Sequence, residues 1–238
     1  MLSEIKLYES DFHLVSYPRS GSSWLRYMLA HMLYPGREWN LQTINSFFPD
    51  IYVVGLNLAS YCRPRFIKSH SAYDPRLKKV VYVYRDVRDV IVSYHNHEKT
   101  VNAYSKGLDE FVREFKRGEV MFGSWKDHVE GWLFSERTQS FLGLKYETLC
   151  SDTVSTLKLL ADFIEINCSV SILKEAAEKF SFQWRKKDVK NFSAHYKKGY
   201  RGGVAGVPGA GRLLSGKQLE TVWEWAGETM EKLGYYRT

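Results

Sequence analysis

The sequence predicts an α/β protein with a central parallel sheet flanked by helices, and three features support this. Runs rich in β-branched and aromatic residues, such as Lys79 to Tyr84, alternate with longer segments of helical periodicity. Polar or charged residues come directly after several of these runs, as they do where parallel sheets bind ligands. The chain has 238 residues, of which 44% are apolar, so we expect a single domain over residues 1–238.

The individual elements follow from periodicity and from capping residues. A strand is expected from Phe12, and Asp86 is expected to cap the helix that follows Tyr84. A long connection is expected over Tyr34 to Pro64, with a short helix near Leu41 to Phe48. The other predicted strands are Arg65 to Ser69, Lys79 to Tyr84 and Ser140 to Tyr146, and the other predicted helices are Leu108 to Lys116, Ser124 to Arg137, Asp152 to Ile164, Val170 to Phe180 and Ser215 to Leu233.

The segment Phe12 to Leu33 is the most informative part of the sequence. It has the character of a strand, a tight polar turn and an apolar helix, with Gly21 in the turn and Arg19 beside it. The N–H groups at the start of such a helix, together with the helix dipole, form an anion-binding site. The segment lacks the GxxxxGK[ST] pattern, which disfavours an ATP-binding loop. The alternative is an ordinary connection in which the serines only cap the helix.

The composition limits the class of partner. The net charge of +7 favours an anionic ligand, although charge alone does not distinguish a nucleotide from nucleic acid, a sulfated glycan or a membrane surface. No apolar run is long enough to span a bilayer, and residues 1–11 do not resemble a secretory signal, so we expect a cytoplasmic protein. Cys62, Cys150 and Cys168 have no metal-ligand spacing and are expected to be thiols.

Several motifs in this order resemble the sulfotransferases that use 3′-phosphoadenosine 5′-phosphosulfate (PAPS), specifically the soluble, cytosolic type. SYPRSGSSW, from Ser16 to Trp24, resembles the family's 5′-phosphosulfate loop, and IKSH, ending at His70, resembles the segment that carries its catalytic base. YRDVRDVIVSY resembles the 3′-phosphate segment, in which an arginine and a serine lie eight residues apart, as Arg85 and Ser93 do. GSWKDHVEGW and LKYETL are further matches.

The resemblance implies an α/β fold with a P-loop-like strand-turn-helix site for the phosphosulfate, PAPS as co-substrate and no metal. It assigns His70 as the general base, with Arg19, Lys68 and Ser93 as further catalytic residues. The nucleotide-binding residues that it implies are Arg19, Ser20, Gly21, Ser22, Ser23, Trp24, Arg85, Ser93, Tyr146, Phe182, Arg201 and Gly203.

Some of these residues have simpler interpretations. Arg85 could form a surface salt bridge with Asp86 or Asp89, and Ser93 could be an exposed helix serine. Trp24 could belong to the core, since aromatic residues at helical spacing are more often buried than bound to a ligand. Tyr146 could likewise only pack beside its strand.

The sequence departs from the family pattern at two places. Arg19 stands where the family usually has lysine, and because a guanidinium hardly loses a proton, we expect a purely electrostatic role for Arg19. Lys68 is then the better candidate for a proton donor. Near Arg201, Gly202 stands where lysine is common, and the usual DW pair is missing, so one phosphate-binding cation is lost.

The predicted function is therefore transfer of a sulfuryl group from PAPS to a hydroxyl or amine of a small-molecule acceptor, with His70 as the base. Trp39, Phe47, Phe48, Tyr52 and Tyr104 suggest a partly apolar acceptor pocket. The alternatives are a glycan or lipid acceptor, a P-loop-like nucleotide kinase, and a non-catalytic module that binds nucleic acid or glycans through its basic surface. We expect no nucleic-acid or membrane partner, and the oligomeric state stays open.

Overall fold

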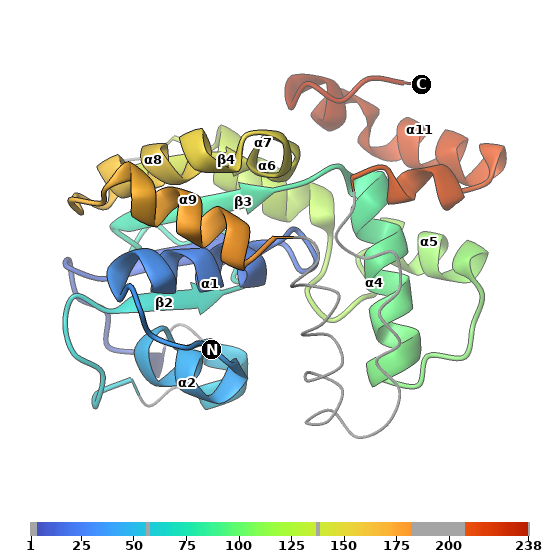
Figure 1. Cartoon of the computed structure of the whole chain (residues 1–238). Coiled ribbons are helices and arrows are strands. Elements are labelled where there is room, and N and C mark those ends of the chain that lie inside the picture. Colours follow the sequence, from blue (N-terminus) through green and yellow to red (C-terminus); the bar gives the residue numbers. More distant parts are fainter. Residues whose placement is uncertain (1–3, 56–57, 137–138, 182–207, 238) are drawn as a thin grey trace. The chain divides into compact units, whose positions relative to one another are not determined.

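Four parallel strands form one sheet in the order β2-β1-β3-β4 (Figure 1). The strands are β1 (Phe12–Ser16), β2 (Phe66–Ser69), β3 (Lys79–Tyr84) and β4 (Ser140–Lys145). Every residue of β1, an inner strand, and of β2, an edge strand, is buried, as is usual for parallel sheets that helices cover. The pairing places Val15 opposite Ser69 and Ser16 opposite Val83, so β1, β2 and β3 end at one edge.

This computed structural model describes residues 4–55, 58–136, 139–181 and 208–237. The chain divides into two compact units. Unit 1 comprises residues 1–16, 20–84 and 136–181, and unit 2 comprises residues 17–19, 85–135 and 182–238. In the described part of both units, no helix combines the length and apolar character that crossing a membrane requires.

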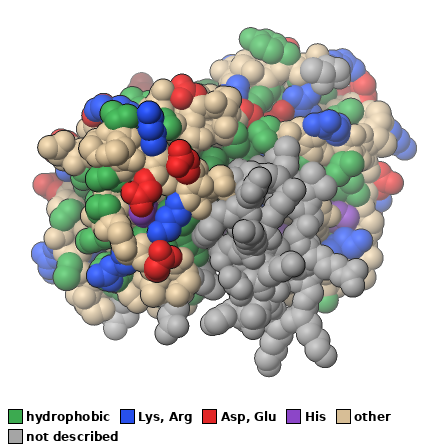
Figure 2. All heavy atoms as spheres, viewed as in Figure 1, with side chains coloured by type: hydrophobic (Ala, Val, Ile, Leu, Met, Phe, Trp, Pro, Cys, Tyr) green, Lys and Arg blue, Asp and Glu red, His purple; other side chains and the backbone are tan. Residues whose placement is uncertain are grey.

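The helices of unit 1 pack on the sheet and on one another. Helix α1 (Ser22–Leu33) contacts β1 and α9 (Val170–Lys179), and α9 contacts α8 (Thr153–Phe163). Figure 1 shows α1 and α9 side by side along the sheet. On the face of unit 1 that Figure 2 shows, basic and acidic side chains are interspersed. The short helices α2 (Leu41–Phe47), α3 (Ile51–Val54) and α7 (Tyr146–Ser151) complete the described helices of this unit.

The described part of unit 2 is helical. Helix α4 (Val87–Val101) packs against α5 (Leu108–Lys116), against the 3-10 helix η2 (Ala210–Leu213) and against α11 (Gly216–Lys232), which also contacts α6 (Trp125–Phe134). Its core is aromatic: the ring of Tyr17 meets Tyr94, Phe115 and His128 edge-on.

Most of the predicted elements are confirmed. Asp86 caps α4 by accepting a hydrogen bond from the Arg88 N–H, and Ser215 forms a capping box with Gln218 at the start of α11. The three cysteines form no disulfide. The predicted strand from Ser140 to Tyr146 is one residue too long: β4 ends at Lys145, and Tyr146 begins α7, a helix that was not predicted.

Two of the five aromatic residues that suggested a partly apolar acceptor pocket lie in the core of unit 1. Trp39 and Phe48 are buried, and they pack against Phe47 and Phe66 respectively. These aromatic residues therefore stabilise unit 1, and their presence is no argument for an apolar acceptor.

His13 lies on β1 with 1% of its surface exposed, and neither ring nitrogen has a hydrogen-bond partner in the described structure. Burial and, to a smaller extent, the charge of Arg65 lower the pKa of His13, while Asp11 and Asp74 partly oppose this shift; the resulting pKa is about 4. The neutral ring is therefore the form that the fold accepts.

We expect His13 to make the protein sensitive to acid. The unfolded chain takes up a proton near pH 6.5, whereas the folded chain does so only near pH 4, so stability present above pH 6.5 is lost as the pH falls through this window. The contribution is about 3 kcal/mol at 1.36 kcal/mol per pKa unit. Urea unfolding of the native protein and of His13→Gln at pH 7 and pH 4.5 measures it: the variant should lose less stability, and an equal loss would contradict this account.

Candidate active site

The turn after β1 is held open by a glycine that no other residue can replace without strain. Gly21 has φ +101°, and a Cβ placed on it would lie 2.3 Å from Cδ2 of Tyr146. Gly21 is also the N-cap of α1, and it has no side chain that could form a cap hydrogen bond. The alternative interpretation expected a serine to cap the helix, whereas the cap position is held by this glycine. The first N–H groups of an α-helix have no acceptor at the usual position within the helix, so this helix end can donate to a ligand.

The serines of the turn have separate roles. Ser22 Oγ accepts a 2.7 Å hydrogen bond from Ser16 Oγ. Ser20 is 1% exposed, and its hydroxyl has no hydrogen-bond partner among the described residues. Ser23 is exposed. A buried hydroxyl without a partner at a helix N-terminus suits an anionic ligand.

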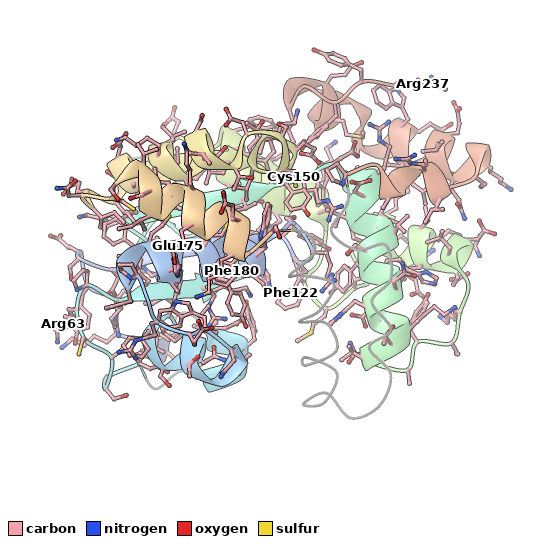
Figure 3. The ribbon with its side chains drawn as sticks, in the orientation of Figure 1. Arg63, Phe122, Cys150, Glu175, Phe180 and Arg237 are labelled. Carbon is pink, nitrogen blue, oxygen red and sulfur yellow. The ribbon has the colours of Figure 1, made fainter. Side chains whose placement is uncertain are left out.

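Trp24 and Tyr146 meet on the other side of this turn. Their rings form an edge-on pair with centroids 6.0 Å apart, and Trp24 Nε1 donates a 2.6 Å hydrogen bond to the carbonyl of Phe180. Phe180, labelled in Figure 3, directly follows α9. Trp24 is 8% exposed and Tyr146 is 1% exposed, so in this structure both rings are part of the packing beneath the turn.

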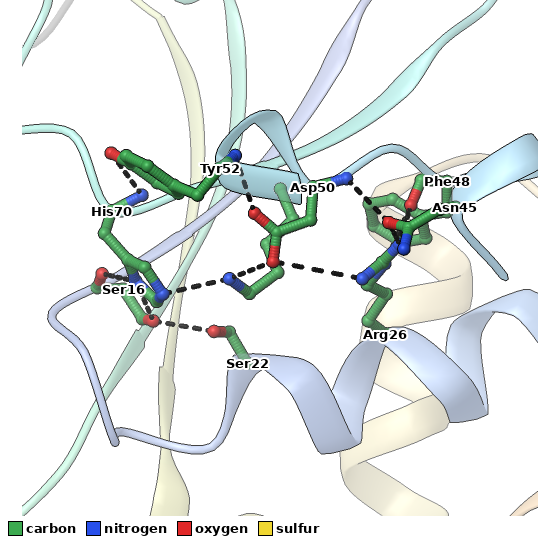
Figure 4. Close-up of polar contacts among 9 residues, drawn as sticks. Ser16, Ser22, Arg26, Asn45, Phe48, Asp50, Tyr52 and His70 are labelled. Atoms are coloured by element: carbon green, nitrogen blue, oxygen red, sulfur yellow. Dashed lines mark hydrogen bonds and ion pairs between the residues drawn. The ribbon is translucent and has the colours of Figure 1, made fainter. Parts of the chain in front are cut away.

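His70 follows β2 directly, and its contacts determine which ring nitrogen carries the proton (Figure 4). Nδ1 lies 2.7 Å from the carbonyl oxygen of Ser16. Because a carbonyl oxygen can only accept, Nδ1 must donate, and the lone pair of the neutral ring is on Nε2. The ring of Tyr52 stacks on the ring of His70 with centroids 5.5 Å apart, and the backbone N–H of His70 donates to the Tyr52 hydroxyl at 3.3 Å.

Lys68 lies between His70 and a carboxylate. Its Nζ is 2.9 Å from His70 Nε2 and 2.8 Å from Asp50 Oδ2, and the side chain is 2% exposed. Burial raises the pKa of the Asp50 carboxyl, but the charge and hydrogen bond of Lys68, together with Arg26, outweigh burial and hold the pKa below its usual value. Lys68 and Asp50 therefore form a buried ion pair beside the imidazole.

In unit 2, the structure brings together three residues that the sequence analysis assigned to the site. Arg19 Nε donates to Ser93 Oγ at 3.1 Å, and Arg85 Nη1 donates to the Arg19 carbonyl at 3.3 Å. Ser93 and Arg85 are each 2% exposed, so Ser93 is not an exposed serine, and the salt bridge of Arg85 with Asp89 that the simpler interpretation expected is present but buried. His97 lies one helical turn after Ser93. Its pKa is lowered to about 4, mainly by burial and to a smaller extent by the charge of Arg19.

Asp89 holds Arg85 in place. Its Oδ2 accepts from Arg85 Nη2 at 3.0 Å and from the Gly209 N–H at 2.9 Å, while Oδ1 accepts from the Gly211 N–H at 2.7 Å. Asp89 is 3% exposed, so the fold of unit 2 depends on this carboxylate.

Three predicted site residues, Phe182, Arg201 and Gly203, lie outside the described residues. Two residues that the sequence analysis did not assign to catalysis, Asp50 and Phe180, contact assigned ones. Asp50 had one local signal, since it precedes a short helix that it caps through the Tyr52 N–H. Where the structure is described, no group of three or more His, Cys, Asp or Glu side chains is arranged to hold a metal ion.

The comparison with known families decides where this site belongs. Residues 9–233 match the family model described as the sulfotransferase domain. The chain belongs to the sulfotransferase domain family. The match spans both units and includes every residue assigned to the site.

Curated sulfotransferases are similar over part of their length. Human sulfotransferase 2B1 is 28% identical over 169 residues, which are 66% of this chain and 46% of that protein. Mouse sulfotransferase 2A1 is 30% identical over 199 residues, which are 78% of this chain and 70% of that protein. The chain thus spans about half the length of human and mouse sulfotransferase 2B1.

Two solved structures share the fold. Mouse sulfotransferase SULT7A1, complexed with PAP (3′-phosphoadenosine 5′-phosphate), has a TM-score of 0.74 and 24% identity. The match covers 96% of this chain and 86% of that one. Retinol dehydratase, in complex with androsterone and the inactive cofactor PAP, has a TM-score of 0.76 and 17% identity, with coverage of 95% and 82%.

Replacing Gly21 with alanine tests the turn. The added Cβ would collide with the Tyr146 ring in a backbone region that L side chains rarely adopt, so we expect Gly21→Ala to lower the free energy of unfolding by about 3 kcal/mol. Gly36→Ala is the matched control, because Gly36 has φ +80° but nothing within 4 Å of its Cβ position. The control should cost about 1 kcal/mol in urea unfolding. Equal losses in the two variants would show that the contact with Tyr146 does not constrain the turn.

Proposed function

We propose that this chain is a PAPS-dependent sulfotransferase that moves a sulfuryl group to a hydroxyl or amine of a small-molecule acceptor, with His70 as general base. The observation that carries this proposal is the tautomer of His70. The Ser16 carbonyl fixes the proton on Nδ1, so Nε2 is the nitrogen that accepts a proton from the acceptor.

Unit 1 has the donors that a phosphosulfate needs. The N-terminus of α1 offers backbone N–H groups, Gly21 lets the backbone come close to an oxyanion, and the buried Ser20 hydroxyl needs a partner. Ser22 and Ser23 add hydroxyl groups. This set fits a phosphosulfate, and we assign Ser20 to Ser23 to its binding.

Unit 2 has the groups that a 3′-phosphate needs. Arg85 is fixed by Asp89, and Ser93 lies on the same helix with its hydroxyl bonded to Arg19. Guanidinium groups pair with phosphate through two parallel hydrogen bonds, and a serine hydroxyl adds a donor. We assign Arg85 and Ser93 to the 3′-phosphate and Arg19 to the charge of the phosphosulfate.

PAPS would supply a sulfuryl group bonded to a phosphate leaving group. As the acceptor oxygen or nitrogen forms its bond to sulfur, the bond from sulfur to the phosphate oxygen breaks, and His70 Nε2 takes the acceptor's proton. Lys68 and Arg19 compensate the negative charge that develops on the leaving oxygen. Arg19 acts only through its charge, because it hardly loses a proton.

The remaining assignments extend the proposal. We assign the adenine to the region of Trp24 and Tyr146, with Phe182 on the other face, and a further part of the 3′-phosphate contacts to Arg201 and Gly203. The acceptor class is the open choice among small hydroxyl compounds, amines, glycans and lipids. A kinase reaction would instead depend on ATP and magnesium.

Replacing His70 with alanine tests the proposal. We expect His70→Ala to lose at least about 100-fold in turnover of labelled PAPS, since general base catalysis contributes 10²–10⁴-fold. PAP should still raise the melting temperature of the variant as it does that of the native protein, because His70 binds no part of the nucleotide. Unchanged turnover would remove His70 from the mechanism, and stabilisation by ATP with magnesium instead of PAP would contradict the sulfotransferase assignment.

A further inference from the structure

We propose that Asp50 is a positioning residue for the reaction: it holds Lys68 charged and aimed at Nε2 of His70, so that Asp50, Lys68 and His70 act as one chain. This inference rests on the proposed function, and it adds a residue that the sequence motifs do not contain. The hydrogen-bonded chain runs from the Ser16 carbonyl to His70, from His70 to Lys68, and from Lys68 to the Asp50 carboxylate. Ser16, His70 and Asp50 are labelled in Figure 4.

The backbone fixes Asp50 beside Lys68. The Lys68 N–H donates to the Pro49 carbonyl at 2.8 Å, and Asp50 forms a parallel bridge with Lys68. The two carboxylate oxygens of Asp50 have different partners: Oδ1 accepts from the Tyr52 N–H at 3.1 Å, and Oδ2 accepts from Lys68 Nζ. Asp50 therefore links the start of α3 to the end of β2.

Charge explains why a carboxylate is needed at this place. Lys68 is 2% exposed, and an ammonium group buried to this extent without a counter-charge would release its proton. Arg26, on α1, lies 4.0 Å from the same Asp50 oxygen, but it also bonds to the Phe48 carbonyl at 2.8 Å. Without Asp50, two buried cations would face each other beside His70.

The hydrogen-bonded chain of Asp50, Lys68 and His70 also bears on the proton transfer. In the resting structure the lone pair of His70 Nε2 faces a Lys68 N–H. Nε2 has a single lone pair, so the Lys68 N–H must turn to another hydrogen-bond acceptor before the hydroxyl or amine of the substrate can donate its proton to Nε2. The leaving-group oxygen, which gains negative charge in the same step, is the acceptor that the reaction offers. Asp50 stays bonded to Lys68, and no proton is gained or lost by either.

Asp50→Asn separates the charge of Asp50 from its other contacts. Asparagine keeps an oxygen that can cap α3, so the variant should fold, whereas the counter-charge of Lys68 is lost. We expect kcat with PAPS at pH 7 to fall by about 10- to 100-fold, as misplaced catalytic groups do, with the PAP dissociation constant within about threefold of the native value. In the variant, kcat should fall further as the pH rises, because Lys68 loses its proton at lower pH; the other groups around His70 are Tyr52 and Arg26.

Two comparisons make the test specific. Asp50→Glu restores the charge and should recover part of kcat. Asp74→Asn removes a carboxylate of the same unit that pairs with Arg76, and it should leave kcat and its pH profile unchanged. An Asp50→Asn variant with the native kcat and pH profile would overturn the inference, as would a lower melting temperature as its only defect.

A readout without turnover keeps this inference distinct from the proposed function. Nitrogen-15 shifts of the His70 ring should show the Nδ1-protonated tautomer in both proteins, because the Ser16 carbonyl is unchanged, whereas the Nε2 resonance should shift in Asp50→Asn, because its partner Lys68 is no longer held charged and in place. This result would support the chain even if the protein transferred no sulfuryl group from PAPS. If PAPS turnover is found but the Nε2 resonance is the same in the native protein and in Asp50→Asn, the role of Asp50 is wrong and the sulfotransferase proposal stands without it.

Discussion

The parallel pairing of β1 with β2 is the constraint on which the candidate base depends. The register places Val15 opposite Ser69, so the next residues of the two strands, Ser16 and His70, leave the sheet at the same edge. The imidazole can then reach the Ser16 carbonyl, and this hydrogen bond decides which nitrogen is basic. A shift of one residue would turn each side chain of β2 to the opposite face and would break the contact.

Unit 1 buries cations, and each one has a carboxylate. Arg65 pairs with Asp11 at 2.5 Å and also donates to the carbonyls of Lys6 and Leu58. These contacts satisfy the guanidinium and fix the approach to β2. The Lys68–Asp50 pair differs because the ammonium also faces a titratable ring. A buried ion pair contributes little net stability in general, so its position beside His70 is better explained by function.

Local patterns were enough to predict the strands and the turn that joins β1 to α1. Lys79 to Tyr84 is a run of β-branched and aromatic residues, and the glycine and serines after β1 are typical of an anion site. Helix α7 was missed because no turn residue separates it from β4. Asp50 was missed because it reaches Lys68 only through the pairing of segments 18 residues apart, which no local period reveals. The burial of Trp39 and Phe48 could not be predicted, because composition does not say whether an aromatic residue packs inward.

Sulfuryl transfer by this protein can be followed with a labelled donor. The native protein is incubated with PAPS carrying sulfur-35 and a panel of phenols, alcohols, amines, glycans and lipids, without added metal. We predict that label moves to at least one of the hydroxyl or amine compounds and that PAP forms in equal amount. A folded protein that binds PAP but labels no member of the panel would contradict it.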